Sequence, residues 1–73
     1  MMIYFGKRPL GRNIRRLRRK HGLSLKQLSR QAAVPYLLLL CIEARILRDI
    51  HHDHLNALCQ TFRTTQEELM GKL

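Results

Sequence analysis

The sequence predicts an all-α protein, a compact bundle of about five helices. Apolar residues recur at intervals of three and four along most of the 73-residue chain. Capping residues precede several of these apolar stretches, whereas strand-like alternation is absent outside the first five residues. A chain of this length forms one small domain with a thin core. We expect residues 1–8 to be an N-terminal arm or tail and residues 9–73 to form the helical domain.

The first helix is predicted over residues 9–20, where Leu10, Ile14 and Leu17 repeat at helical spacing. Gly22 provides a left-handed stop after it. The first five residues of the chain, "MMIYF", are either a frayed tail or a strand-like arm that pairs with a second subunit.

The second and third helices are predicted over about 24–32 and 35–44. Ser24 and Gln27 form a capping box at the start of the second helix, and Pro35 suits the first turn of the third. The core residues expected from periodicity in this region are Val34, Leu39 and Ile42.

Residues 45–50, "RILRDI", read as a connection to a fourth helix that begins near His52. The apolar stripe of that helix consists of Leu55, Leu58, Cys59 and Phe62. A second capping box, Thr65 with Glu68, opens a short fifth helix.

Charge is distributed unevenly along the chain, whose formal net charge is +9. Residues 1–42 contain ten Lys or Arg and no acid, whereas residues 43–73 contain four basic and five acidic residues.

The longest apolar run, Ala32 to Ile42, has 11 residues, against the roughly 20 that span a bilayer. We therefore expect no membrane partner, no secretory signal and a cytoplasmic location, with Cys41 and Cys59 as reduced, mostly buried thiols.

The stretch "LGRNIRRLRRKHGLSLKQLSRQAAV", continued by Ile42-Glu43 and "LNALCQTFRTTQEELM", resembles the lambda-repressor-like, Xre/Cro-type helix-turn-helix family. The resemblance covers roughly residues 10–70. It implies that the second and third helices form the helix-turn-helix and that the third lies in the DNA major groove. It also implies a structural salt bridge between Arg18 and Glu43 that ties the first helix to the third.

The sequence departs from the family pattern at two turns. Ala33 replaces the turn glycine between the second and third helices, and we expect this to be tolerated because the turn need not be left-handed at every residue. Arg45 replaces the glycine that commonly follows the third helix.

A further departure concerns base reading, because apolar residues occupy positions where family members usually carry polar ones. The candidate base-facing residues are Leu25, Tyr36, Leu37, Leu40 and Cys41. Side chains of these types form no bidentate hydrogen bond with a base edge, and such a bond is worth about 1–3 kcal/mol of discrimination. Contact with thymine methyl groups, the Tyr36 hydroxyl and DNA shape remain as means of recognition.

The arginines of the first helix indicate an anionic partner. Arg12, Arg15, Arg16 and Arg19 are spaced three or four residues apart with no acid between them, and each such pair costs about 0.2–0.5 kcal/mol until an anion binds. A solvated cationic face is the alternative explanation. The candidate phosphate contacts are Lys7, Arg8, Arg12, Arg15, Arg16, Lys26, Arg45 and Arg48.

Four consecutive leucines, residues 37–40, lie in the third predicted helix. We expect Leu39 in the core and Leu38 partly covered, and we expect Tyr36, Leu37 and Leu40 to be exposed. An exposed apolar patch usually marks a contact surface. This patch would mediate self-association, bind a partner protein or contact a thymine-rich DNA sequence.

We therefore expect a DNA-binding transcriptional regulator that is a homodimer and binds double-stranded DNA. The alternative is a protein-interaction or self-association module on the same scaffold, with weak or no DNA binding. No nucleophile, base and orienting group form a catalytic constellation, so we expect no enzyme activity and no cofactor. The adjacent ligand-type residues "HHDH", 51–54, point in different directions on a helix start, so we expect no metal site.

Overall fold

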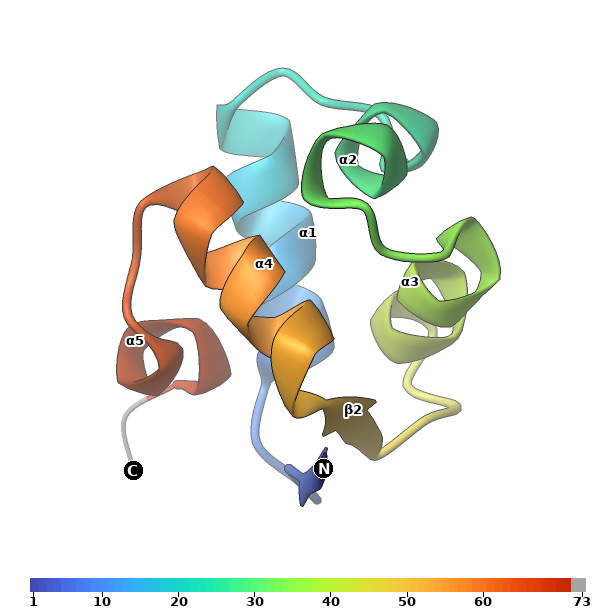
Figure 1. Ribbon diagram of the computed structural model, residues 1–73, viewed down its shortest axis with the longest axis vertical. Coiled ribbons are helices and arrows are strands. Elements are labelled where there is room, and N and C mark those ends of the chain that lie inside the picture. Colours follow the sequence, from blue (N-terminus) through green and yellow to red (C-terminus); the bar gives the residue numbers. More distant parts are fainter. Residues whose placement is uncertain (72–73) are drawn as a thin grey trace.

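The computed structural model describes residues 1–71, in which five helices form a bundle above a two-stranded sheet (Figure 1). The helices are α1 (Leu10–Lys20), α2 (Leu25–Ala32), α3 (Tyr36–Glu43), α4 (His52–Phe62) and α5 (Gln66–Met70). The strands are β1 (Met2–Tyr4) and β2 (Asp49–His51). The predicted all-α class with five helices is confirmed, and the short sheet is a minor addition.

The capping residues identified in the sequence act as predicted. The Ser24 hydroxyl accepts a hydrogen bond from the Gln27 N–H, and the Gln27 side chain accepts one from the Ser24 N–H. Thr65 and Glu68 form the same reciprocal pair at the start of α5. Gly22 has a φ of +67°, so it is the left-handed residue that follows α1. These local signals explain why the helix ends in the structure agree with the ends predicted from the sequence to within about two residues.

The core lies between the helices and is filled by aliphatic side chains from all five of them. α1 packs against α3 and α5, α2 packs against α3 and α4, and α4 also contacts α5 and β2. The fully buried large side chains are Leu10, Ile14, Leu28, Val34, Leu39, Ile42, Ile50, Leu55, Leu58 and Leu69. Val34, Leu39 and Ile42 are thus buried as predicted.

Two close contacts of α1 were not expected from the sequence. Gly11 lies against the backbone of Ile42 in α3, so closely that a Cβ atom at Gly11 would overlap the Ile42 carbonyl oxygen. The buried Asn13 side chain donates a hydrogen bond from Nδ2 to the Leu69 carbonyl oxygen in α5, at 2.8 Å. Both contacts hold neighbouring helices at fixed positions on α1.

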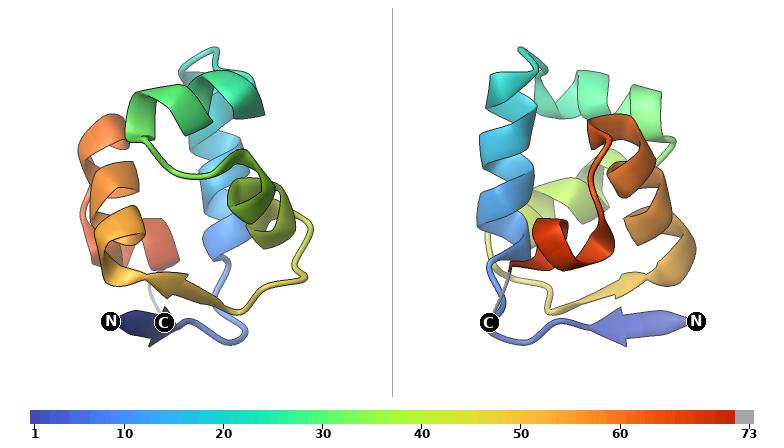
Figure 2. Two further views of the ribbon diagram at one scale, coloured as in Figure 1. Left: turned by 45° about the vertical axis from the view of Figure 1, so that its right-hand side comes forward. Right: turned by 90° about the vertical axis from the view of Figure 1, so that its left-hand side faces the viewer.

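The N-terminal residues are part of the domain rather than a separate arm or tail. β1 pairs antiparallel with β2 of the same chain, with Met2 opposite His51, Ile3 opposite Ile50 and Tyr4 opposite Asp49 (Figure 2). Phe5 is buried in the core. Residues 72 and 73, at the other end of the predicted domain, lie outside the described residues.

The interpretation of residues 45–50 as a connection was wrong at Asp49 and Ile50, which belong to β2. A three-residue strand has too few residues to show alternation, and its partner lies 47 positions earlier in the chain, as Ile3 and Ile50 show. Only the tertiary structure brings the two strands together.

The explanation offered for Ala33 was also wrong. Ala33 does adopt the left-handed conformation, with φ 54° and ψ 43°. Arg45 and Arg63 are left-handed as well, with φ of 63° and 54°. For an L-residue with a Cβ this conformation costs about 1–2 kcal/mol, so the turns after α2, α3 and α4 retain the geometry that glycine would suit best.

Candidate nucleic-acid interface

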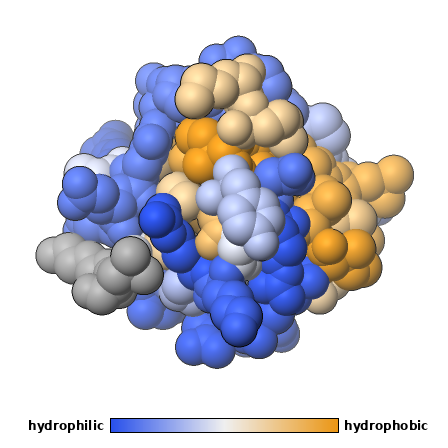
Figure 3. Space-filling view, turned by 90° about the horizontal axis from the view of Figure 1, so that it is seen from below, coloured by the Kyte–Doolittle hydropathy of each residue, from blue (hydrophilic) through white to orange (hydrophobic). Residues whose placement is uncertain are grey.

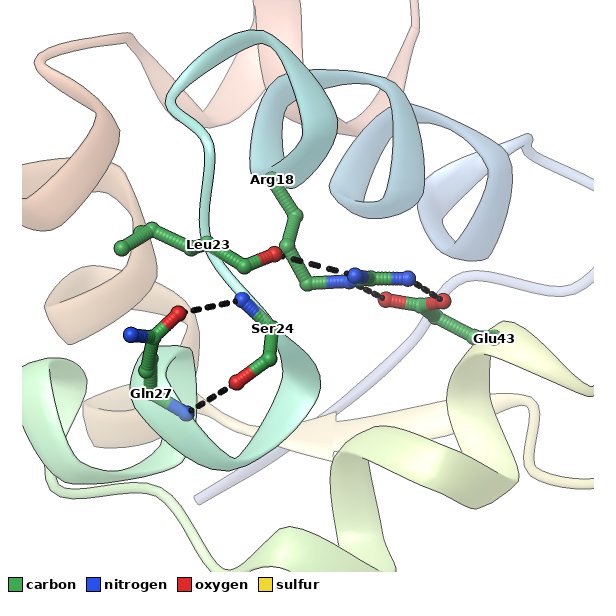
Figure 4. A network of polar contacts seen from close by, with 5 residues as sticks. All are labelled: Arg18, Leu23, Ser24, Gln27 and Glu43. Carbon is green, nitrogen blue, oxygen red and sulfur yellow. Dashed lines mark hydrogen bonds and ion pairs between the residues drawn. The ribbon is translucent and has the colours of Figure 1, made fainter.

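An ion pair between Arg18 and Glu43 positions α3 on the bundle (Figure 4). The guanidinium donates from Nε to Glu43 Oε2 at 3.0 Å and from Nη2 to Glu43 Oε1 at 3.1 Å. A third hydrogen bond runs from Nη1 to the Leu23 carbonyl oxygen at 3.0 Å. These contacts join α1, α3 and the loop before α2, as the family resemblance implied for the two charged residues.

The environment of this ion pair favours the charged form of Arg18. The hydrogen bonds to Glu43 raise the pKa of Arg18. Partial burial lowers this pKa by a smaller amount, so the net shift is upward. The guanidinium is occupied by its three contacts within the fold. Arg18 is therefore a structural residue rather than a free cation for a ligand.

The outward face of α3 is apolar. Leu37 is 69% exposed and Leu40 is 42% exposed, whereas Leu39 is fully buried on the opposite side. Tyr36 is also exposed, and Cys41 is half-buried. Positions one, two, five and six of a helix share one face, so these four candidate base-facing residues form a single strip. We call Tyr36, Leu37, Leu40 and Cys41 the α3 strip.

The fifth candidate base-facing residue, Leu25, has a different environment. It is the first residue of α2, is half-buried and packs against the core. Much of its side chain is therefore occupied within the protein.

A cationic hollow lies at the C-terminal end of α3. It has a volume of about 80 Å³, and its lining includes Ile42, Phe5, Pro9 and Gly11. The five basic residues that line it are Lys7, Arg8, Arg12, Arg45 and Arg48. They are five of the eight candidate phosphate contacts, and they come from two separate segments of the chain, residues 7–12 and 45–48. The underside of the molecule accordingly shows strongly hydrophilic surface beside apolar surface (Figure 3).

The cations of this hollow keep their charges available. No acidic side chain lines the hollow, and none of the five forms an ion pair with another residue of the described chain. Arg48 donates from Nη1 to the Gly6 carbonyl oxygen at 3.1 Å, which uses one of its five donors. The hollow therefore concentrates positive charge beside α3 and suits an anionic ligand.

A second, shallow hollow lies at the N-terminal end of α3. Its lining consists of Lys26, Ser29, Arg30 and Tyr36. Arg30 was not among the candidate phosphate contacts, although its spacing of four residues from Lys26 places both on one face of α2. The α3 strip thus has basic residues at both of its ends.

The two other phosphate candidates, Arg15 and Arg16, lie exposed on α1 and line neither hollow. Their helix contributes Arg12 to the cationic hollow, one turn earlier in the chain. They extend the basic surface of α1 beyond the hollow.

Most acidic residues lie on other elements. Asp49 is in β2, Asp53 is in α4, and Glu67 and Glu68 are in α5. Glu43 is the acid of α3, and its carboxylate is held by Arg18. The surface around the α3 strip is therefore positive, while the acids gather near β2, α4 and α5.

His51 has a local structural role. His51 caps α4 by accepting a hydrogen bond from the Asp53 N–H at Nδ1. Among residues 1–71, no group of three or more His, Cys, Asp or Glu is arranged to hold a metal ion. Both cysteines are free thiols, and burial raises the pKa of the Cys59 thiol.

Comparison with known proteins does not assign the chain to a family, since no family model, curated protein or solved structure matches it. Within the described part of the chain, none of the helices is both long enough and apolar enough to cross a bilayer.

Proposed function

We propose that the protein is a DNA-binding transcriptional regulator that places α3 at the major groove of double-stranded DNA. The observation that carries this proposal is the presence of basic side chains at both ends of an exposed helix. Five cations line the hollow after α3, and Lys26 and Arg30 lie beside its first residue. Phosphate groups on the two sides of a groove are the natural partners of such a pair of clusters.

The dimensions of α3 agree with this placement. An eight-residue helix is about 12 Å long, which is close to the roughly 12 Å width of the B-DNA major groove. Basic residues at the two ends of α3 would then lie near the phosphates that border the groove. Arg18, Glu43 and Gly11 hold α3 firmly on α1, so the helix needs no rearrangement to dock.

The sequence resemblance to Xre/Cro-type regulators supports the same proposal, because α2 and α3 follow each other with only residues 33–35 between them. A cytoplasmic location belongs to this proposal.

We also include a homodimer in the proposal, with β1 as the contact surface. Hydrogen bonds from Phe5 N to Arg48 O and from His52 N to Met1 O flank the β1–β2 pairing. Because bonded pairs alternate in an antiparallel ladder, Ile3 pairs with Ile50, and the backbone groups of Met2 and Tyr4 point away from β2. Their side chains are 53% and 75% exposed. This open edge is able to pair with the β1 strand of a second copy.

A salt titration tests the DNA-binding proposal. Affinity for a mixed-sequence 20-base-pair duplex is measured by fluorescence anisotropy at several salt concentrations. If the seven cations of the two hollows contact phosphates, the log-log slope is about −6 for each bound protomer. Absence of binding at low salt would refute the proposal.

Two single substitutions provide a matched comparison for the titration. Arg45→Ala removes a cation of the hollow, whereas Arg63→Ala removes an exposed arginine at the end of α4, outside both hollows. Both arginines have a left-handed backbone, so the two changes perturb the chain similarly. We expect Arg45→Ala to reduce the slope by about one and Arg63→Ala to leave it unchanged.

The alternative function is a protein-interaction or self-association module that uses the α3 strip. The exposure of Leu37 and Leu40 favours it, because exposed apolar patches often mark protein contacts. This module would bind DNA weakly or not at all, so the same titration separates the two functions.

A further inference from the structure

We propose that Leu37 and Leu40 recognise the C5-methyl groups of thymine, so that the protein selects DNA with thymines in the major groove. This inference rests on the proposed function and names the class of DNA that the same site takes. It makes the two leucines specificity-determining residues, although neither is able to form a hydrogen bond with a base.

The side chains available on the exposed face of α3 lead to this inference. Leu37 and Leu40 are the most exposed residues of the α3 strip, and in the sequence they lie between its other two members, Tyr36 and Cys41. None of the four has the paired donors or acceptors that read guanine or adenine. Apolar contact is therefore the main means by which α3 distinguishes one base from another.

Major-groove chemistry supplies one apolar group that matches these leucines. Each base pair presents hydrogen-bonding groups in the major groove, and thymine alone adds a methyl group there. A leucine placed against a guanine–cytosine pair would instead cover polar atoms and leave them without partners. The α3 strip thus favours thymine and disfavours cytosine at the positions that it covers.

The charges around α3 argue against a second copy of the chain as its occupant. Two α3 strips packed against each other would bring Lys26, Arg30 and Arg45 of both copies close together. Within residues 1–71, none of these cations is neutralised by an ion pair, so that contact is repulsive. A polyanion with apolar groups in its groove would instead pair with the surrounding cations and offer the two leucines an apolar contact.

Removal of the methyl group from the DNA provides a direct test on the unmodified protein. Affinity is compared between a 20-base-pair alternating A·T duplex and the same duplex with uracil in place of every thymine. Loss of one contacted methyl is expected to weaken binding about fourfold, the equivalent of about 0.8 kcal/mol. A G·C duplex with 5-methylcytosine should bind more tightly than its unmethylated form, because that methyl occupies the same place in the groove.

Substitutions then assign the effect to the two leucines. In the Leu37→Ser/Leu40→Ser double variant, the ratio of thymine to uracil affinity should fall to about one. Ile46→Ser is the matched control, because Ile46 is 71% exposed but lies beyond α3, and it should keep the ratio of the unmodified protein. Circular dichroism verifies the fold, and the single Leu37→Ser variant serves if the double variant unfolds.

The outcomes distinguish this inference from the proposed function. Equal affinity for thymine and uracil duplexes, with binding still steeply salt-dependent, overturns the methyl inference and leaves DNA binding intact. A thymine preference that survives in the double variant also overturns it, because the methyls would then be read elsewhere. No binding to any duplex at low salt overturns both.

Two further measurements address other occupants of the α3 strip. Sedimentation velocity reports self-association, and co-sedimentation with phosphatidylglycerol vesicles reports binding to an anionic membrane surface. Dependence of either process on Leu37 and Leu40, without a thymine preference, would overturn the inference in favour of that occupant.

Discussion

Gly11 of α1 and Ile42 of α3 meet backbone to backbone, with no room for a side chain between them. A Cβ atom at Gly11 would overlap the Ile42 carbonyl oxygen and lie 3.1 Å from the carbonyl carbon. The same two residues line the cationic hollow. This contact therefore sets both the distance between the two helices and the shape of the candidate phosphate site.

Gly11→Ala should destabilise the protein, although alanine normally favours a helix by about 0.5–1 kcal/mol over glycine. Overpacking against backbone typically costs about 1–3 kcal/mol, and the thermal midpoint followed by circular dichroism should fall. Gly22→Ala is the comparison, because Gly22 has open space around it and loses only its left-handed conformational advantage. A Gly11→Ala protein as stable as the parent would contradict the close contact.

Glu43→Ala should strongly destabilise the fold, because it leaves the partly buried Arg18 guanidinium without its carboxylate. The side chains are only 15% and 10% exposed, so we expect a loss of about 3 kcal/mol in the free energy of unfolding. Urea denaturation measures this loss. Glu43→Gln, which retains a hydrogen-bond acceptor, should lose less, and the reverse order would be inconsistent with the ion pair.

Arg45→Gly should stabilise the protein but weaken DNA binding. Glycine relieves the left-handed conformation of residue 45, and we expect a gain of about 0.5–1 kcal/mol, which raises the thermal midpoint by several degrees. Removal of the cation from the hollow should at the same time reduce affinity for DNA. Arg63→Gly should give the same stabilisation with unchanged affinity, so equal DNA binding by the two variants would exclude Arg45 from the interface.

Cys41 should react with a thiol reagent such as Ellman's reagent in the free protein and be protected when DNA is bound. Cys41 belongs to the α3 strip, whereas Cys59 is 6% exposed, and burial raises the pKa of the Cys59 thiol. Little reactive thiolate is therefore present at Cys59 near neutral pH. In the Cys41→Ser variant, only the slow reaction of the Cys59 thiol should remain. An unchanged rate at Cys41 in saturating DNA would place α3 away from the groove.

Tyr4→Pro should reduce dimer formation without unfolding β1. The Tyr4 N–H points away from β2, so proline at this edge position removes a donor that only a second copy would use. Ile3→Pro should disrupt the β1–β2 pairing itself. Sedimentation equilibrium measures the dimer, and a Tyr4→Pro protein that still dimerises like the parent would show that another surface mediates the contact.

The helices could be predicted from the sequence because their signals are local. Ser24 with Gln27 and Thr65 with Glu68 act within one turn, and the apolar spacing of residues such as Leu55 and Leu58 reflects a single buried face. The exposed position of Leu37 and Leu40 was also predictable, since the other apolar stripes already fill a small core. The interpretation of Ala33 failed because this residue ends α2 in the left-handed conformation, with its N–H bonded to the Ser29 carbonyl oxygen, at a position that glycine more often occupies.

The sequence by itself determined the five helices, the surplus of positive charge and the apolar character of the third helix. Only the tertiary structure decided that Lys7 and Arg12 line one hollow with the distant Arg45, and that Ile3 pairs with Ile50. The physical reason is that helix formation depends on neighbours within a few residues. The hollow and the sheet depend on contacts that exist only after Gly11 and Arg18 have docked α3 against α1.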